Sequence, residues 1–171
     1  MSVIIQRQSQ QGASVVEFAL VLPLFLLLLF AIVDFGMYFY TQHTMQYATR
    51  EGMRLALVGG RVTREEELLD RKDSIITTIK EQASLALDPS RLEISIFELH
   101  ELPADAEENS VFVDPPDWQE RQDAGRPGKF MRVRTQYDYT FLTPFIGSLF
   151  PNNSIRIEAQ TTYRNELFDE S

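Results

Sequence analysis

Gly12 and Glu17 are the two residues of this chain whose types and spacing favour chemistry. The small residues that begin at Gly12 are a candidate cleavage site. A cut there would leave a new amino terminus about one helical turn before the Glu17 carboxylate. Phe18 follows and begins a run of residues without charge. If this run spans a membrane, the Glu17 carboxylate beside it is energetically costly unless something outside the helix needs it. The pattern therefore predicts a membrane subunit that assembles rather than a simple anchor.

Residue types suited to catalysis or metal binding are scattered along the rest of the chain. His43 and His100 are far apart in sequence, no cysteine is present, and no His-x-x-x-His spacing occurs. The pair Gly59-Gly60 lacks the pattern of a phosphate-binding loop. We therefore expect no enzyme, no cofactor, no metal site and no disulfide.

The charge balance indicates which partners to exclude. The 171 residues carry a formal net charge of -9. Phosphate binding needs clustered Lys and Arg, so an acidic chain argues against nucleic acid as a partner. The length suits one membrane helix and one modest domain.

The segment from Phe18 to Tyr40 predicts a transmembrane helix. Its 23 residues include one charged side chain, Asp34, and as a helix they would rise about 34 Å, enough for a hydrocarbon core of ~30 Å. Residues 24–30 show no polar face, unlike a soluble core helix. A cleaved secretory signal is the alternative, but residues 34–38 fit its small-x-small cleavage site poorly.

Three residues in or near this helix are candidates for a structural or assembly role. Pro23 removes one backbone donor, so we expect a bend there, either tolerated or used when the helix leaves lipid. Asp34 is either a residue at the membrane surface or a contact with Arg50 or Arg54 of another subunit. Gly36 permits close approach of another helix.

Beyond the membrane, periodicity predicts two helices and three strands. The first helix continues to Gly59-Gly60, and a second begins at a Thr63–Glu66 capping box and ends near Leu87. The predicted strands are 92–97, 130–141 and 154–164, with a helical turn at 143–149. The fold class is thus α+β, in which one long amino-terminal helix extends into a domain with the second helix packed on a small antiparallel sheet.

Two further groups are candidate subunit contacts. In the element Arg50-Glu51-Gly52-x-Arg54, the two arginines lie one turn apart on the same side of the helix. The element is either a docking site for another subunit or a solvated helix face with a packing position at Gly52. Trp118 lies in the acidic connection 100–129, where it either contacts a partner or tucks under the loop.

The amino-terminal region resembles TadE-like proteins, minor pseudopilin-like proteins of the Tad type of type IV pilus system. The resemblance rests on a polar leader ending at Gly12, then Val16-Glu17-Phe18-Ala19, Pro23 and a leucine-rich core. It continues through Asp34, Gly36 and the Arg50-Glu51-Gly52-x-Arg54 element. It covers roughly residues 11–58.

The resemblance implies processing and topology. A prepilin peptidase would cut between Gly12 and Ala13 on the cytoplasmic face, and Glu17 of one subunit would pair with the Ala13 amine of its neighbour. The chain would then be a single-pass protein of the bacterial inner membrane, with the amino terminus cytoplasmic and the carboxy-terminal domain periplasmic. Its implied partners are the prepilin peptidase, another minor pseudopilin, the major Flp pilin and inner-membrane platform proteins. A leader with a single basic residue, Arg7, departs from the family pattern.

We therefore expect a minor pseudopilin that takes part in the initiation or regulation of a Tad-type pilus. The alternative is an uncleaved, signal-anchored periplasmic binding or assembly-chaperone module. The expected organisation is a leader (1–12), a transmembrane helix (13–40), a helical extension (41–60) and a periplasmic α+β domain (61–171).

Overall fold

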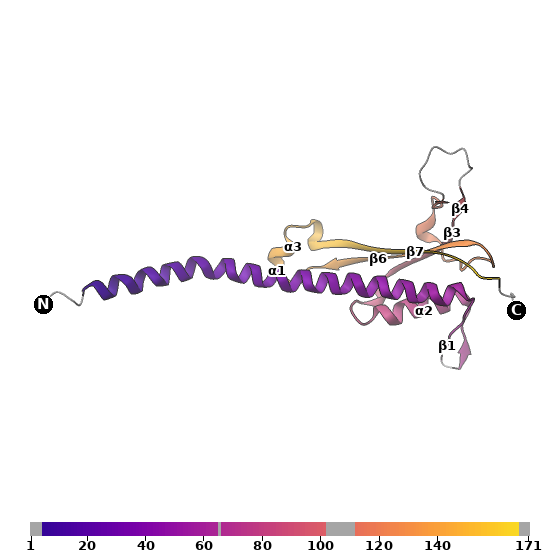
Figure 1. Ribbon diagram of the computed structural model, residues 1–171, viewed down its shortest axis with the longest axis horizontal. Coiled ribbons are helices and arrows are strands. Elements are labelled where there is room, and N and C mark those ends of the chain that lie inside the picture. Colours follow the sequence, from indigo (N-terminus) through magenta and orange to yellow (C-terminus); the bar gives the residue numbers. More distant parts are fainter. Residues whose placement is uncertain (1–4, 65, 102–111, 168–171) are drawn as a thin grey trace. The chain divides into compact units, whose positions relative to one another are not determined.

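The computed structural model describes residues 5–64, 66–101 and 112–167 (Figure 1). It confirms the predicted α+β class, with a long apolar amino-terminal helix, a second helix and small antiparallel sheets. The chain divides into two compact units. One comprises Met1–Tyr38 with Thr140–Ser154, and the other comprises Phe39–Tyr139 with Ile155–Ser171.

Helix α1 spans Ile5–Leu57 and includes Pro23. Leucine and other residues with good helix propensity fill its apolar part. The helix ends where Gly59 adopts a positive φ of 65°. The Gly59 amide donates to the Ala56 carbonyl at 3.2 Å and the Gly60 amide donates to the Leu55 carbonyl at 3.0 Å, which is a Schellman motif. The predicted end at the glycine pair is confirmed, and the bend at Pro23 stays a prediction.

Helix α2 spans Arg71–Ala83, so the predicted start at Thr63 is wrong. The Asp70 side chain caps this helix by accepting from the Arg71 amide at 2.5 Å. The residues before it form a hairpin in which β1 (Thr63–Arg64) pairs antiparallel with β2 (Glu67–Leu68). The predicted capping box fails because Glu66 has a φ of 72°, which reverses the chain instead of starting a helix.

The main sheet has the order β3-β6-β7, with strands Glu93–Glu98, Phe130–Thr140 and Ser154–Arg164. The three predicted strands are thus confirmed within a residue or two. Strands β3 and β6 are antiparallel, with Glu93 opposite Gln136 and Glu98 opposite Met131. Residues 121–123 cover the free edge of β3, where the Ile96 amide donates to the Arg121 carbonyl at 2.9 Å.

Short elements complete the described chain. Strands β4 (His100–Glu101) and β5 (Phe112–Val113) pair antiparallel. The predicted turn at 143–149 is found as helix α3, Pro144–Gly147. Turns of 3₁₀ helix occur at Pro89–Arg91, Trp118–Glu120 and Pro151–Asn153.

The hydrophobic core of the second unit combines α1, α2 and the sheet. The helices contribute apolar side chains three or four residues apart, and the strands contribute alternate residues except on β3, where the neighbours Ile96 and Phe97 are both buried. The fully buried members are Met45, Ala48, Ala56, Ile75, Ile79, Ala83, Ile96, Phe97, Met131 and Val133. The carboxy-terminal part of α1 is therefore a core element of the folded domain.

Candidate functional site

The stretch from Gly12 to Phe18 lies on α1 and is exposed throughout. A side chain at Gly12 would meet no described atom within 4 Å. Within the part of the chain that the structure describes, no group forms a hydrogen bond or ion pair with the Glu17 carboxylate. The Phe18 side chain is 65% exposed. The two residues that favour chemistry thus sit on an open helix surface, accessible to another protein.

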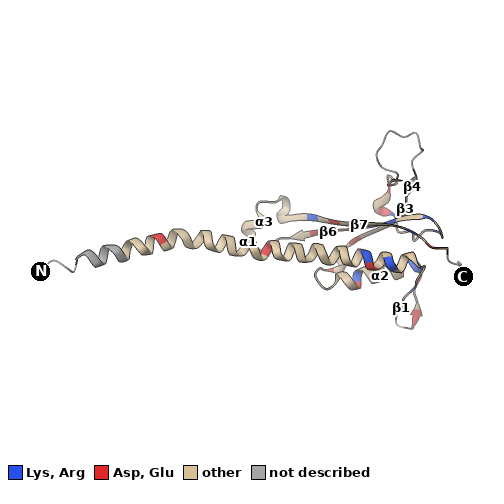
Figure 2. Cartoon of the chain, in the orientation of Figure 1, with Lys and Arg blue, Asp and Glu red and all other residues tan. Residues whose placement is uncertain are grey.

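The apolar surface of α1 continues uncovered beyond Phe18. In the described chain, α1 is the one helix that is long and apolar enough to cross a membrane, and none of its most apolar stretch is buried within the molecule. From Gly12 to Thr49 its charged side chains are the two acidic ones, Glu17 and Asp34 (Figure 2). A core helix of a soluble protein would be buried on its apolar face, so this surface requires lipid or another chain.

Asp34 differs from Glu17 because its side chain is fully buried. Its Oδ1 accepts from the Leu142 amide at 2.8 Å, and its Oδ2 accepts from the Thr143 amide at 3.1 Å. The Thr143 hydroxyl also donates to Oδ2. Within this chain the Asp34 carboxylate therefore already has hydrogen-bond partners. A contact of Asp34 with an arginine of another subunit stays a prediction. Sequence periodicity could not indicate a bond between residues 108 positions apart.

The Arg50-Glu51-Gly52-x-Arg54 element divides between the surface and the core. Arg54 Nη2 lies 2.5 Å from Glu51 Oε1, and both side chains keep solvent exposure. This pair holds the pKa of Glu51 below its ordinary value, chiefly through the hydrogen bond from Arg54. Arg50 is exposed and Gly52 is buried. The arginines are thus the accessible part of the element.

Gly52 is a packing position between two helices. A Cβ there would lie 2.3 Å from Ile79 Cγ1 and 2.8 Å from Cδ1, so the absence of a side chain allows α2 to approach α1. This agrees with the packing alternative that the sequence left open. Gly36 has an open environment, with no described atom within 4 Å of a Cβ there.

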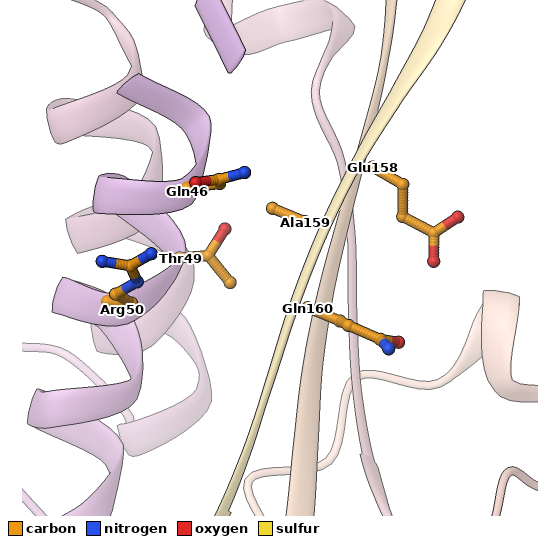
Figure 3. Close-up of a pocket in the computed structure, with 6 residues that line it drawn as sticks. All are labelled: Gln46, Thr49, Arg50, Glu158, Ala159 and Gln160. Carbon is orange, nitrogen blue, oxygen red and sulfur yellow. The ribbon is translucent and has the colours of Figure 1, made fainter. Parts of the chain in front are cut away.

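A pocket of about 250 Å³ lies between α1 and β7 (Figure 3). Gln46, Thr49 and Arg50 line the helix side, and residues 158–160 line the strand side. Glu158 and Gln160 point away from the helix in Figure 3, and Ala159 points toward it. Thr49 Oγ1 already bonds the Met45 carbonyl at 2.7 Å and Thr135 Oγ1 at 2.8 Å. The lining offers no paired acid and base, so it supports no catalytic reading.

Trp118 packs within its own domain. Its ring lies 6.0 Å from the Phe97 ring, and the guanidinium of Arg134 sits 4.2 Å above it. Arg134 Nη2 also binds Asp114 Oδ2 at 2.8 Å, and Arg132 binds the other oxygen of Asp114. This geometry matches the alternative in which the indole holds down the connection, and a partner contact at Trp118 stays a prediction.

Arg71 is a structural residue that the sequence did not reveal. Its guanidinium is almost fully buried and donates to the carbonyls of Ala56 and Gly125, at 2.7 and 2.8 Å, and to Asn165 Oδ1 at 2.8 Å. Asn165 in turn donates to the Ala124 carbonyl at 3.1 Å. The residue therefore ties together the ends of three segments distant in sequence, and no local pattern signals that.

No group of three or more His, Asp or Glu side chains placed to hold a metal ion occurs among the residues described. The candidate site consists of the open Gly12–Phe18 stretch and the uncovered apolar helix that follows it.

Comparison with known proteins gives one match. The family described as TadE-like protein matches residues 12–54, a quarter of the chain. No curated protein and no solved structure matches the chain. The predicted resemblance is thus confirmed over a segment that begins at Gly12, contains Glu17 and Asp34, and ends at Arg54.

Proposed function

We propose that this chain, similar to TadE-like proteins over residues 12–54, is a minor pseudopilin that takes part in the initiation or regulation of a Tad-type pilus. One observation carries the proposal. The matched segment begins at the candidate cleavage residue Gly12 and places an exposed Glu17 carboxylate on an uncovered apolar helix, with no partner for that carboxylate among the described residues. An apolar helix of this type is stable when its surface packs against lipid and against other membrane helices.

The proposed organisation follows the predicted boundaries. Residues 1–12 are a leader, 13–40 a transmembrane helix, 41–60 its helical extension and 61–171 the periplasmic domain. The protein spans the inner membrane once with its amino terminus in the cytoplasm. Its partners are a prepilin peptidase, a second minor pseudopilin, the major Flp pilin and the inner-membrane platform.

Cleavage after Gly12 supplies the charge that Glu17 lacks. The Ala13 amine would have an unperturbed pKa of about 7.7–8.0 and would be largely protonated at neutral pH. Pairing of this amine with Glu17 of a neighbouring subunit offsets the cost of a carboxylate among apolar side chains. It also fixes the axial stagger of the two helices. Gly36 and the exposed arginines Arg50 and Arg54 are further contact candidates along the same helix, and Pro23 is a candidate bend.

The mass of the mature amino-terminal peptide tests this function. The full-length protein is expressed in two hosts that differ only in a functional prepilin peptidase. We expect a chain that starts at Ala13 in the peptidase-positive host and at Met1 in the other. A Gly12→Val variant, which places a branched side chain at the cut, is expected to keep Met1 in both hosts.

A chain that starts at Met1 in both hosts would reject the pseudopilin proposal and favour the uncleaved, signal-anchored alternative. A start at another residue in both hosts would instead indicate processing by a different peptidase, which also contradicts the proposal.

A further inference from the structure

The connection between β6 and β7, residues 141–150, is bound to α1 through Asp34. The Leu142 and Thr143 amides and the Thr143 hydroxyl all donate to the Asp34 carboxylate. The Phe141 ring meets the Phe35 ring edge-on at 6.3 Å and stacks on Phe150 at 4.5 Å. These contacts lie within one compact unit, so the connection has a defined level along the helix.

That level coincides with the end of the uncharged part of α1. Phe18 to Val33 contains no charged residue and rises about 24 Å as a helix, which is less than a hydrocarbon core of ~30 Å. The side chains beyond Asp34 are still apolar, and Phe35 and Met37 remain exposed. A helix that spans the bilayer from Phe18 therefore carries Asp34 at or just inside the hydrocarbon edge.

A carboxylate at this depth is costly when it faces lipid. The connection removes that cost because it covers Asp34 and supplies three hydrogen-bond donors to it. A polar loop would not gain from sitting at this level, whereas a loop with an apolar outer surface would.

The outer surface of the connection is apolar. Leu142, Phe145 and Leu149 are 62%, 58% and 68% exposed. No charged residue occurs between Asp138 and Arg156. Three large apolar side chains on a ten-residue connection are an unfavourable surface in water, and they belong to the same compact unit as the exposed apolar part of α1.

The backbone of the connection is also suited to a poorly hydrated environment, where polar groups need internal partners. The Gly147 amide donates to the Thr143 carbonyl and the Ser148 amide to the Pro144 carbonyl, both at 2.9 Å. The Phe150 amide donates to the Gly147 carbonyl at 2.9 Å, and the Ser148 hydroxyl donates to the Phe145 carbonyl at 2.7 Å.

We propose that residues 141–150 form a membrane-seated loop, whose Leu142, Phe145 and Leu149 enter the lipid interface while its backbone screens Asp34. The loop gives the protein a second membrane contact beside its helix. Apolar side chains of interfacial segments reach about 5–10 Å into the headgroup and acyl boundary, which fits the level of Asp34. This inference rests on the proposed transmembrane span of α1.

Depth-dependent fluorescence quenching tests the proposal. The chain contains no cysteine, so Phe145→Cys provides a single labelling position for an environment-sensitive dye. The labelled full-length protein is placed in vesicles of phosphatidylcholine and phosphatidylglycerol at low protein density. A fraction of the lipids carries a nitroxide quencher, either near the headgroup or near the end of the acyl chain. Leu27→Cys reports on the span, and Lys80→Cys, exposed on α2, reports on the solvated domain.

We expect the Phe145 label to be quenched at least about two-fold more strongly by the shallow nitroxide than by the deep one. The Leu27 label should show the reverse order, and the Lys80 label should be quenched by neither. If the Phe145 label behaves like the Lys80 label while the Leu27 label is quenched, the loop is not in lipid and the span still stands. If the Leu27 label is also unquenched, both the span and the loop proposal fail. A blue-shifted Phe145 label that neither lipid quenches would mean that a protein covers the loop, which also overturns the proposal.

A second variant tests the role of Asp34. In the Phe145→Cys background, Asp34→Ala leaves the Leu142 and Thr143 amides without their acceptor. Shallow quenching of the Phe145 label should then fall at least about two-fold, since the loop loses its attachment to the helix. In a matched Leu27→Cys protein that also carries Asp34→Ala, the Leu27 signal should not change. Unchanged quenching at Phe145 would reject Asp34 as the residue that holds the loop at the interface.

Discussion

Two acidic side chains on the same apolar helix have opposite environments. Asp34 is buried and accepts hydrogen bonds from the connection between β6 and β7. Glu17 is exposed and has no partner among the residues that the structure describes. The cost of a carboxylate in an apolar setting is therefore met inside the chain at Asp34, whereas at Glu17 it must be met by another molecule.

Replacement of Glu17 tests whether that molecule is a neighbouring subunit. We expect Glu17→Ala to be cleaved normally but to reduce pilus number about ten-fold or more, since a charge-assisted contact contributes on the order of 1.5–3 kcal/mol. Amino-terminal mass and pilus counts by electron microscopy provide the two readouts. Glu67→Ala, which removes an exposed carboxylate on β2, is the control. Normal pilus counts in Glu17→Ala would argue against the pairing with the Ala13 amine.

Single residues also show what the sequence could not reveal. The small size of Gly52 indicated a packing position, but its partner Ile79 lies on another helix. Asp34 and Thr143 are joined only in the folded chain. Such contacts depend on tertiary placement, for which periodicity carries no information. The Gly12–Phe18 stretch, in contrast, is exposed and was singled out from residue types and spacing alone, while its role in cleavage and assembly stays a prediction.

At the scale of elements, the strands were more predictable than the start of α2. The alternation of apolar residues identified β3, β6 and β7 because each contributes to one core. On β3 the polar residue Ser95, between Ile94 and Ile96, is also buried. Its hydroxyl donates to the Gln119 carbonyl at 3.1 Å, in the connection between β3 and β6. The Thr63–Glu66 spacing is that of a helix capping box, but these residues belong to the hairpin of β1 and β2. The cap of α2 is Asp70.

Arg71, the first residue of α2, joins this helix to other elements. Arg71→Met should lower the free energy of unfolding by about 3–5 kcal/mol, because several buried carbonyl and amide oxygens lose a charged donor. Lys72→Met is the control. Its ion pair with Asp73 at 3.6 Å is solvent-exposed, so the loss should be below ~0.5 kcal/mol.

Urea unfolding of the full chain in detergent micelles measures both Arg71 and Lys72 variants. The single tryptophan, Trp118, packs on Phe97 in the same unit as Arg71, so its fluorescence reports on this unit. Equal midpoints for the two variants would show that Arg71 does not hold the segment ends together.

At the scale of the whole molecule, the free energy of unfolding depends on pH through the groups whose pKa differs between the folded and unfolded chain. Arg156 lowers the pKa of Asp138 and Arg121 lowers that of Asp117, in each case mainly through a hydrogen bond. A carboxylate with a lowered pKa stabilises the folded state above its unfolded pKa of about 4, and the effect is lost as pH falls. Because these pairs are solvent-exposed, they give only a shallow acidic dependence.

The alkaline dependence should come from one buried tyrosine. Burial raises the pKa of Tyr163 far above its ordinary value, and its hydroxyl has no hydrogen-bond partner among the described residues. The unfolded phenol ionises at about pH 10 while the folded one keeps its proton, so the contribution to stability is complete below that pH and is lost as pH rises. Above that pH the ionisation of Tyr163 in the unfolded chain should lower the free energy of unfolding by about 1.4 kcal/mol per pH unit.

Tyr163→Phe should remove that slope in urea unfolding followed from pH 9 to 11, with little effect at pH 7 since no hydrogen bond is lost. Tyr47→Phe, at an exposed position, should retain the slope. An identical alkaline slope in both variants would mean that Tyr163 ionises with the folded chain intact.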